Sequence, residues 1–327
     1  MSENAAIQIQ PPFLFDKENN KNNRCYKQVG QHAFGFSYGL PYIVDWELPA
    51  ICKNDEENEW QHLVLIVETT CSGVQFDRIG AIWIGGLEIL RTSTQEPGGR
   101  DIYYKFEVDL TRYINFLKLK PKKKLVMALD NLVDKTYTGI FNITLTAVVY
   151  YSNKETKKDS FFNLNNENNI PQILKPSGEE SVSIKDIPDL IFPLSNSDDN
   201  YGYFALRNNS KVTVSLPHLP KNKNFKKVLL EVQTSHHQSD EFYYLNTTNP
   251  YKEMQIFVNE KMAGIIHPFP LIFTGGITPY LWRPIVSIGA LICPTYLIDV
   301  TPFLGDLIVN NGFNNVSFRV ENGLDVW

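Results

Sequence analysis

The chain has 327 residues, of which 43% are hydrophobic and 13% aromatic, so it is long enough to build two domains with hydrophobic cores. Its formal net charge of -5 gives no electrostatic reason to expect binding to nucleic acid or to an anionic membrane surface. No apolar run has the length of a membrane-spanning helix, and the first residues lack the apolar core of a secretory signal peptide.

Short apolar segments dominate the first half of the chain. Residues 1–24 are polar and are expected to form a loose arm. The following segments are rich in Val, Ile and aromatic residues and are too short for helices, which predicts β-strands. These predicted strands lie within 32–43, 64–67, 81–84, 87–90, 103–108, 125–129 and 138–150.

Two connections in this half have distinct compositions. Gly85 and Gly86 predict a tight hairpin turn. The Gly- and Pro-rich segment 92–101 predicts a long surface loop, which is the kind of segment that carries site residues.

Residues 152–185 contain many Lys and Asn and few large apolar residues, which predicts a linker or exposed excursion between two domains.

The second half repeats four features of the first in the same order. Three are strand patterns: VLIVETT and VLLEVQT at 64–70 and 228–234, VDLT and IDVT at 108–111 and 298–301, and LVMALDN and VSFRVEN at 125–131 and 316–322. The fourth is an acid seven residues after the first pattern, Asp77 in one copy and Glu241 in the other. Strand patterns also recur by chance in β proteins, but the shared order favours a duplicated β domain.

Asp77 and Glu241 are the candidate acids for chemistry. If the two halves pack about a pseudo-twofold axis, both carboxylates face the crevice between the halves and can divide acid and base work on one substrate. The alternative is that each acid accepts hydrogen bonds from the backbone of its own turn. Asp240 competes with its neighbour Glu241 for the same role.

Several aromatic and basic residues accompany these acids. Aromatic faces suit the apolar face of a sugar ring, with core packing as the alternative, for Phe76, Trp83, Phe242 and Trp282. Arg78 and Arg283 are candidates for hydrogen bonds to carbonyl or acetamido oxygens, or for structural ion pairs. Six scattered His residues lack the spacing of a metal site, and no nucleotide, serine-hydrolase or CxxC motif occurs, so no metal or cofactor is expected.

Modification sites give a mixed indication of compartment. Sequons make glycosylation candidates of Asn142, Asn208, Asn246 and Asn315, although an Asn-rich sequence also produces sequons by accident. Three cysteines lie near one another in sequence and are disulfide candidates: Cys25, Cys52 and Cys71. The four cysteines of the chain allow three full pairings, and the sequence does not decide between them.

Seven ordered stretches carry a family resemblance: FGFSYGLP at 34–41, TCSGVQFDRIGAIWIGGLEILRTST at 70–94, DLTRY at 109–113, DKTYTGIFN at 134–142, DEFYY at 240–244, PFPLIFTGGITPYLWRPI at 268–285 and DVTPFLG at 299–305. Through them the chain resembles the peptide-N-glycanase A family, the glycoamidases that cut N-linked glycans from asparagine, over nearly its whole length from Cys25 onward. It is more distantly similar to the bacterial peptide-N-glycanase F.

The resemblance implies an all-β fold of two consecutive antiparallel jelly-roll β-sandwich domains packed side by side, here at 25–151 and 186–327, with the active site in the cleft between them. It implies Asp77 as the principal catalytic carboxylate and Glu241 as the second acid. Residues expected to bind substrate are Arg78, Phe76, Asp130, Asp240, Phe242, Trp282 and Arg283.

The implied activity is that of a peptide-N4-(N-acetyl-beta-glucosaminyl)asparagine amidase. This enzyme hydrolyses the amide between asparagine and the proximal N-acetylglucosamine of an N-glycopeptide or N-glycoprotein, and leaves aspartate. A monomer is expected, with no metal or cofactor, no nucleic acid and no membrane insertion. The resemblance implies the secretory pathway, vacuole or extracellular space, although no signal peptide is visible.

The sequence departs from the family at four points. The family has Gly at the Asp130 position, and its members carry a signal peptide and a further C-terminal β region, neither of which is expected in this sequence. Cys293 falls outside the family pattern and is expected to be a buried free thiol. The alternative is therefore a catalytically inactive or truncated glycan-binding jelly-roll protein, or a structural β sandwich.

Overall fold

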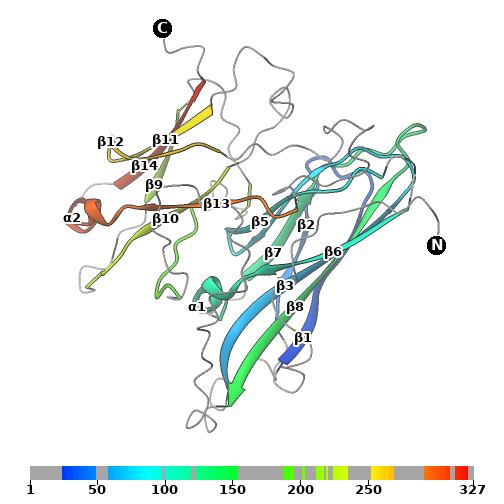
Figure 1. Cartoon of the computed structure of the whole chain (residues 1–327), viewed down its shortest axis with the longest axis horizontal. Coiled ribbons are helices and arrows are strands. Elements are labelled where there is room, and N and C mark those ends of the chain that lie inside the picture. Colours follow the sequence, from blue (N-terminus) through cyan, green and yellow to red (C-terminus); the bar gives the residue numbers. More distant parts are fainter. Residues whose placement is uncertain are drawn as a thin grey trace, which may run out of the picture.

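The computed structural model describes residues 24–48, 58–97, 99, 101–118, 123–153, 187–194, 201–202, 211–216, 219, 224–234, 252–268, 291–309 and 314–322. Strands dominate these residues, and every strand pair is antiparallel. The prediction of an all-β protein is therefore confirmed. Figure 1 shows two strand-rich lobes, formed by the first and second halves of the chain.

Two four-stranded sheets build the first half. One has the order β1-β8-β3-β6 and the other the order β2-β7-β4-β5. The chain changes sheet at every connection except the β4–β5 hairpin, which is the strand order of a jelly roll. The strands are β1 (Arg24–Phe34), β2 (Tyr42–Trp46), β3 (Asn58–Ser72), β4 (Ile79–Ile84), β5 (Leu87–Ser93), β6 (Ile102–Asp109), β7 (Lys123–Leu129) and β8 (Ile140–Asn153).

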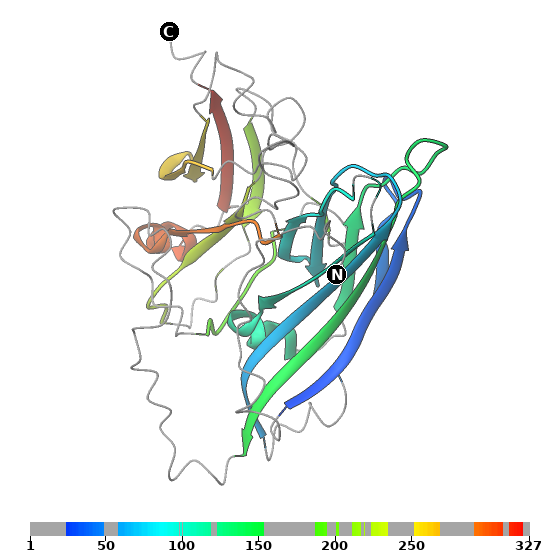
Figure 2. The ribbon, with the colours of Figure 1, turned by 45° about the vertical axis from the view of Figure 1, so that its right-hand side comes forward.

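The core of this half lies between the two sheets. Successive side chains of a strand point to opposite faces, so each strand contributes every second residue to the core. Five such residues from five strands are at most 1% exposed: Phe34, Leu65, Ile82, Phe106 and Leu125. Burying a side chain of this size contributes about 1.5 to 3 kcal/mol. Figure 2 shows β1, β8 and β3 curving together as one layer.

The second half repeats the strand order of the first. Its sheet β12-β11-β14-β9, taken in reverse, corresponds to β2-β7-β4-β5, and its sheet β10-β13 corresponds to β3-β6. Counterparts of β1 and β8 do not occur among the residues described in this half. The strands are β9 (Lys211–Leu216), β10 (Leu229–Gln233), β11 (Lys252–Val258), β12 (Lys261–Ile266), β13 (Thr295–Asp299) and β14 (Asn314–Asn322).

Fine details of register confirm the duplication. The β4–β5 pairing shifts by one residue between Ile82 and Trp83, and the β11–β12 pairing shifts between Ile256 and Phe257. Ile82 and Ile256 therefore occupy the same place in the two copies. A bulge at one fixed position is a specific feature of a sheet, and its recurrence is hard to explain by chance strand similarity.

Both of these hairpins turn through two residues with positive φ. Gly85 and Gly86 have φ of 58° and 86°, and Asn259 and Glu260 have φ of 48° and 63°. Two successive positive φ values make the turn whose twist matches that of the flanking strands. The first copy therefore uses glycines, and the second uses residues with side chains for the same geometry.

In the structure, the first repeated strand pattern aligns between the two halves one residue away from the alignment predicted from the sequence. The N–H of Leu63 donates to Thr111 Oγ1 at 3.3 Å, and the N–H of Val228 donates to Thr301 Oγ1 at 2.9 Å. Val228 is thus the counterpart of Leu63, whereas the sequence patterns align it with Val64. Both alignments match apolar residues, and the hydrogen bonds agree with the strand pairing, in which Val64 pairs with Asp109 and Leu229 with Asp299.

Short helices follow β6 and β13 and are absent from the sequence-based prediction. They are η2 (Thr111–Tyr113) with α1 (Ile114–Lys118), and η6 (Thr301–Phe303) with α2 (Leu304–Val309). Each begins where an aspartate accepts the N–H of a threonine two residues later, Asp109 to Thr111 at 2.8 Å and Asp299 to Thr301 at 2.9 Å. The Thr301 hydrogen bonds lower the pKa of Asp299.

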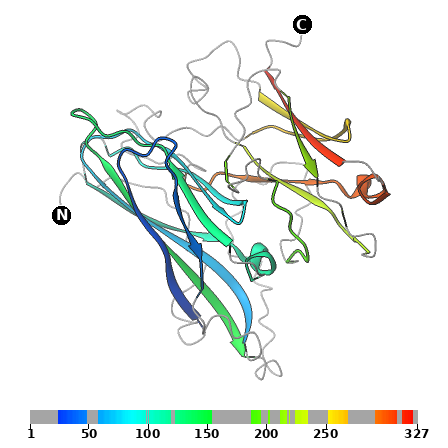
Figure 3. The same ribbon diagram turned by 180° about the vertical axis from the view of Figure 1, so that it is seen from behind.

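Figure 3 shows α2 on the side of the second lobe away from the first. None of the described helices is long and apolar enough to cross a membrane.

Polar contacts join the two halves. The N–H of Cys293 donates to the backbone oxygen of Arg91 at 2.9 Å. Glu231 of β10 forms an ion pair with Arg112 at 3.4 Å and accepts a hydrogen bond from the Tyr113 hydroxyl. Leu291 and Cys293 pack into the core of the first half. The two halves therefore lie side by side.

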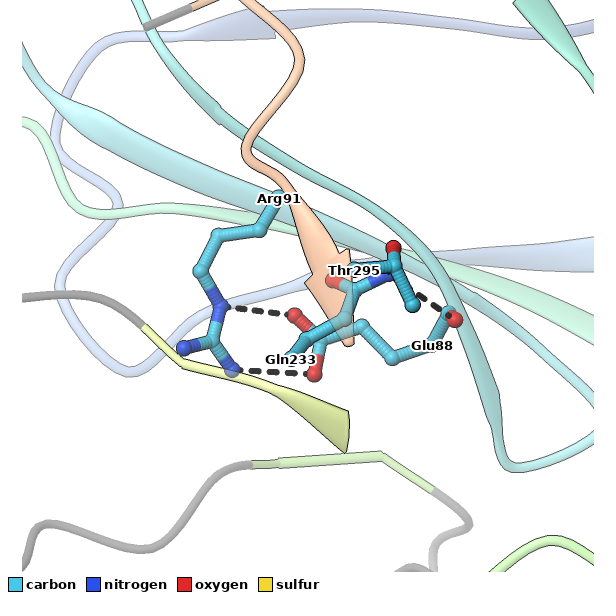
Figure 4. Close-up of polar contacts among 4 residues, drawn as sticks. All are labelled: Glu88, Arg91, Gln233 and Thr295. Atoms are coloured by element: carbon cyan, nitrogen blue, oxygen red, sulfur yellow. Dashed lines mark hydrogen bonds and ion pairs between the residues drawn. The ribbon is translucent and has the colours of Figure 1, made fainter. Parts of the chain in front are cut away.

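A buried ion pair lies at this junction. Arg91 donates from Nε and Nη2 to the two carboxylate oxygens of Glu88, at 2.8 and 2.9 Å (Figure 4). Gln233 Nε2 lies 3.5 Å from both the backbone oxygen of Glu88 and Thr295 Oγ1. Burial raises the pKa of Glu88 more than the charge of Arg91 lowers it.

Candidate active site

Four connections meet at one end of the first sandwich. They join β1 to β2 (35–41), β3 to β4 (73–78), β5 to β6 (94–101) and β7 to β8 (130–139). In a jelly roll each of these connections crosses between the sheets at the same end, so residues far apart in sequence become neighbours. The predicted site residues Phe76, Asp77, Arg78 and Asp130 all lie here.

Asp77 lies in the β3–β4 connection, two residues before β4 begins, and is half-buried. Its neighbour Phe76 is 47% exposed, and the Phe76 ring lies 4.9 Å from the ring of Tyr137 in the β7–β8 connection. An acid and an exposed aromatic surface therefore lie side by side. This combination suits a substrate with a polar reacting group and an apolar ring face.

Arg78 is held by two side-chain amides. Its Nε donates to Asn131 Oδ1 at 3.2 Å, and its Nη2 donates to Gln75 Oε1 at 2.7 Å. Asn131 and Gln75 are 0% and 1% exposed. Arg78 is therefore fixed by neutral acceptors, which leave its positive charge uncompensated by these two partners.

The two amides are themselves oriented by backbone oxygens. Asn131 Nδ2 donates to the oxygens of Phe34 and Gly139, at 2.9 and 3.0 Å. Gln75 Nε2 donates to the oxygens of Leu132 and Gly139, at 3.0 and 3.2 Å. With both NH₂ groups engaged, the amide oxygens must face Arg78.

Ser37 and Asp130 connect the β1–β2 connection to this network. Ser37 Oγ donates to the backbone oxygen of Leu129 at 2.6 Å and accepts the Asn131 N–H at 3.1 Å. Asp130 Oδ1 accepts the Gly39 N–H at 3.2 Å. Asp130 thus has a local role in holding the β1–β2 connection, and its predicted role in substrate binding stays a prediction.

Sequence reasoning missed Gln75, Asn131 and Glu96. Gln75 and Asn131 are directly adjacent to predicted site residues, but amides in loops carry no recognisable signal. Glu96 did carry a recognisable sequence signal, because it lies in the Gly- and Pro-rich segment expected to carry site residues. That segment is less exposed than predicted. β5 extends to Ser93, and Thr94 and Gln95 are 1% and 4% exposed.

Other predicted site residues lie outside the described residues: Glu241, Asp240, Phe242, Trp282 and Arg283. Their proposed roles therefore stay predictions. Along the sequence, Glu241 lies 11 residues before Lys252, the first residue of β11, whereas Asp77 lies two residues before Ile79, the first residue of β4.

Cys71 is a free thiol, which corrects its prediction as a disulfide candidate. Cys25 takes part in a disulfide and pairs with Val149 in the sheet, whereas Cys71 pairs with Phe141 on the same strand β8. These positions are roughly 26 Å apart along β8, so the two cysteines cannot bond. Burial raises the pKa of Cys71 to about 11. Cys52 lies outside the described residues.

Cys293 is buried and free, as predicted, and burial raises the pKa of its thiol to about 12.

Trp83 is unavailable to a sugar because it is only 1% exposed and its ring packs against the Tyr201 ring, with 6.1 Å between the ring centroids. Core packing is therefore the correct alternative for this tryptophan.

Two glycosylation candidates are described. Asn142 lies on β8 and is exposed, which is compatible with an attached glycan. Asn315 lies on β14 and is half-buried, and its N–H donates to Asn259 Oδ1 at 2.9 Å. Asn208 and Asn246 lie outside the described residues. Within the described residues, no group of three His, Cys, Asp or Glu side chains is placed to hold a metal ion.

Comparisons with known proteins agree on one family. The sequence profile described as peptide N-acetyl-beta-D-glucosaminyl asparaginase amidase A matches residues 12–326. The chain is 35% identical over 348 aligned residues to peptide-N4-(N-acetyl-beta-glucosaminyl)asparagine amidase A of Prunus dulcis, covering 99% of this chain and 57% of that protein. The chain thus spans less than two-thirds of this relative's length.

Solved structures of PNGF-II in two crystal forms are also similar to this chain. They have TM-scores of 0.43 and 0.46 and are 14% identical to it. The matches cover 92% and 97% of this chain, and 61% and 60% of the PNGF-II chains.

Proposed function

Because the chain belongs to the peptide N-acetyl-beta-D-glucosaminyl asparaginase amidase A family, we propose that it is a glycoamidase acting on N-glycopeptides or N-glycoproteins. It hydrolyses the amide between asparagine and the proximal N-acetylglucosamine. Water adds an oxygen to the asparagine side-chain carbonyl carbon, the carbon–nitrogen bond breaks, and the products are aspartate and a glycosylamine. The observation that carries this proposal is that Arg78, the residue after Asp77 in the chain, is held by Asn131 and Gln75 at the loop end of the first sandwich.

The two residues have complementary roles in this proposal. The carboxylate of Asp77 accepts a proton from the attacking water as general base. The fixed guanidinium of Arg78 donates to the carbonyl oxygen, where negative charge develops when water adds. Because Asn131 and Gln75 hold Arg78 before substrate arrives, little reorganisation accompanies that stabilisation. Glu241 orders the water from the second half.

Substrate contacts follow from the same end of the sandwich. The exposed face of Phe76, supported by the Tyr137 ring, binds the apolar face of the first sugar. This feature also suits the second candidate function, a glycan-binding protein without catalysis. We further propose that the chain acts as a monomer in the secretory pathway, where its substrates are made.

A single experiment separates the two functions. A defined N-glycopeptide is incubated with the protein in H₂¹⁸O, and the peptide is examined by mass spectrometry. The glycoamidase proposal predicts an aspartyl peptide that carries one ¹⁸O atom. Asp77→Asn should lower the rate by about 10² to 10⁴-fold, the usual contribution of a general base.

Asp101→Asn is the matched control. Asp101 is an exposed acid in the β5–β6 connection, at the same end of the sandwich. The control should retain the wild-type rate. An intact glycopeptide that co-elutes with the protein would favour the glycan-binding function, and a fully active Asp77→Asn variant would remove Asp77 from the mechanism.

A further inference from the structure

Three large apolar side chains lie exposed to solvent at the end of the first sandwich that carries Asp77. They belong to the β1–β2 connection (GFSYGLP, 35–41), which contains no charged residue. Phe36 is 69% exposed, Tyr38 53% and Leu40 61%. We call these three residues the apolar rim. Single exposed apolar residues are ordinary on a protein surface, but three on one short turn form a patch.

The turn that carries the apolar rim is held rigidly. The Leu40 N–H donates to the Ser37 oxygen at 3.1 Å, and Gly39 has a φ of 65°, as in a type II turn. The Ser37 N–H donates to the Asn131 oxygen at 2.9 Å, and the Gly39 N–H donates to Asp130 Oδ1 at 3.2 Å. Because the residues between the rim side chains are fixed, binding to the rim costs little ordering of the turn.

Strand order places the apolar rim on one flank of the connection that carries Asp77. The two sheets have matching orders, β1-β8-β3-β6 in one and β2-β7-β4-β5 in the other. The connections at this end therefore follow one another as β1–β2, β7–β8, β3–β4 and β5–β6. Asp77 lies in the third of them, so the rim is on one side of it and the β5–β6 connection is on the other.

Apolar surface continues from the rim toward Phe76. A Cβ atom built on Gly35 would lie 3.8 Å from Cγ1 of the exposed Ile140. The residue before Ile140 donates its N–H at 2.9 Å to the oxygen of Val74, which is also exposed. Val74 and Phe76 lie two residues apart in the β3–β4 connection. Three neighbouring connections thus contribute exposed apolar residues between the rim and Asp77.

The apolar rim is within reach of a polypeptide whose glycosylated asparagine lies at Arg78. Asn131 links the two places, because its N–H donates to Ser37 Oγ at 3.1 Å and its Oδ1 accepts Arg78 Nε at 3.2 Å. With a single residue between them, Ser37 Oγ and Arg78 Nε are at most about 11 Å apart, the span of about three extended residues. Substrate side chains two or three positions from the asparagine can therefore contact the rim.

The opposite flank has different chemistry. The β5–β6 connection is held against Arg78, whose oxygen accepts the Thr94 N–H and whose N–H donates to Thr94 Oγ1, both at 2.8 Å. The described residues of this connection that reach solvent are two carboxylates and a glycine, Glu96, Asp101 and Gly99. Apolar substrate side chains are therefore favoured on the β1–β2 flank and disfavoured on the β5–β6 flank.

The chemistry of the rim disfavours a sugar, and its size disfavours a second copy of the chain. Phe36 and Leu40 carry no polar side-chain atom, so sugar hydroxyls placed against them would lose hydrogen bonds to water without replacement. Leu40 also lacks the flat ring face that packs on a sugar ring. The three rim residues expose roughly 400 Å², whereas a stable protein–protein interface buries about 800 Å² per partner. Apolar side chains of a polypeptide meet both limits.

We propose that the apolar rim binds apolar side chains of the substrate polypeptide on one side of the glycosylated asparagine. This inference rests on the proposed function and adds a specificity to it. The protein selects among glycosylated asparagines by the residues beside them, because apolar neighbours on one side are removed from water against Phe36, Tyr38 and Leu40.

Three synthetic N-glycopeptides with one common glycan test this specificity. The first has Ser-Gly on both sides of the glycosylated asparagine. A Leu-Phe pair replaces Ser-Gly before the asparagine in the second peptide and after it in the third. The wild type should cleave one Leu-Phe peptide with a kcat/KM about 10-fold above that of the Ser-Gly peptide, the scale of a small apolar contact. The other Leu-Phe peptide should gain nothing, because the rim lies on one flank.

The double variant Phe36→Ser with Leu40→Ser should abolish this preference. All three peptides should then be cleaved at the rate at which the wild type cleaves the Ser-Gly peptide, which also shows that the variant is folded. Ile43→Ser is the matched control. Ile43 is 50% exposed, but it lies beyond the turn on β2, where it pairs with Val126. This variant should keep the wild-type preference.

The contrary results are distinct from one another. A wild type that cleaves the two Leu-Phe peptides alike, or a preference that survives in the double variant, overturns the proposal. An equal loss on all three peptides in the double variant assigns the rim to the glycan, and a dimer that the double variant dissociates assigns it to a second copy.

Failure of the proposed function is recognised separately, because the wild type then cleaves none of the three peptides. Fluorescence anisotropy with the same peptides, carrying a dye, then decides the role of the rim. The proposal requires that the wild type binds one Leu-Phe peptide about 10-fold more tightly than the Ser-Gly peptide and that the double variant does not. Equal binding of the three peptides by the wild type overturns it.

Discussion

Asn131 Oδ1 accepts a hydrogen bond from Arg78 Nε at 3.2 Å, across 53 positions of sequence. The same asparagine donates from Nδ2 to Phe34 and Gly139, and its N–H donates to Ser37. One fully buried amide thus ties the β1–β2 and β7–β8 connections to the connection that carries Asp77. The geometry of the candidate active site depends on this residue more than on any contact at the surface.

Asn131→Ala should lower the free energy of unfolding by about 2 to 3 kcal/mol. The buried oxygen of Phe34 loses its amide donor, whereas Gly139 keeps the bond from Gln75 Nε2. Urea denaturation measures the change. Asn115→Ala is the control, because the Asn115 side chain bonds the Pro188 oxygen in an exposed setting and should cost no more than about 0.5 kcal/mol. Equal effects of the two changes would contradict the central place of Asn131.

Arg91→Leu should cost about 3 to 5 kcal/mol at pH 7, because it leaves the buried Glu88 charge unpaired. Burial already holds the pKa of Glu88 above its ordinary value, and loss of Arg91 raises it further. The folded state then binds a proton that the unfolded state has lost, so stability falls as pH rises from the ordinary glutamate range. Urea unfolding at pH 4.5 and pH 7 should therefore show the smaller loss at pH 4.5.

The double variant Glu88→Gln with Arg91→Leu tests this explanation. Removing the charge of Glu88 should abolish most of the pH dependence and recover part of the lost stability. An unchanged pH dependence would assign it to other groups at the junction of the two halves.

Asn259→Gly should destabilise the protein by about 1 kcal/mol, although it makes the second hairpin more like the Gly85–Gly86 turn of the first. Asn259 Oδ1 accepts the Asn315 N–H at 2.9 Å, and its Nδ2 donates to Asn314 Oδ1 at 2.8 Å. Thermal unfolding measures the effect.

The neighbouring change Glu260→Gly is the control for this hairpin. It removes an ion pair with Lys211 in which the Glu260 side chain is 72% exposed, and such pairs contribute little. It also relieves a non-glycine residue of positive φ, so the net change should be within about 0.5 kcal/mol. A larger loss than that of Asn259→Gly would contradict the role given to the asparagine.

Much of the fold was predictable because strand patterns are local. The short segments rich in Val, Ile and aromatic residues at 81–84 and 87–90, joined at Gly85 and Gly86, predict the β4–β5 hairpin. The short helices after Asp109 and Asp299 were missed. They are one or two turns long, and such segments carry no periodicity that distinguishes them from a strand end.

Sequence by itself determined the strands, their duplication and Asp77 as the candidate acid, because each follows from residue type and spacing along the chain. Tertiary structure alone decided which loops meet. It brought Asn131 to Arg78 and the Glu96 segment to that of Asp77, and it separated Cys71 from Cys25 despite their proximity in sequence. The physical reason is that a jelly roll alternates between two sheets, so neighbours in space are set by strand order across the sandwich and not by distance along the chain.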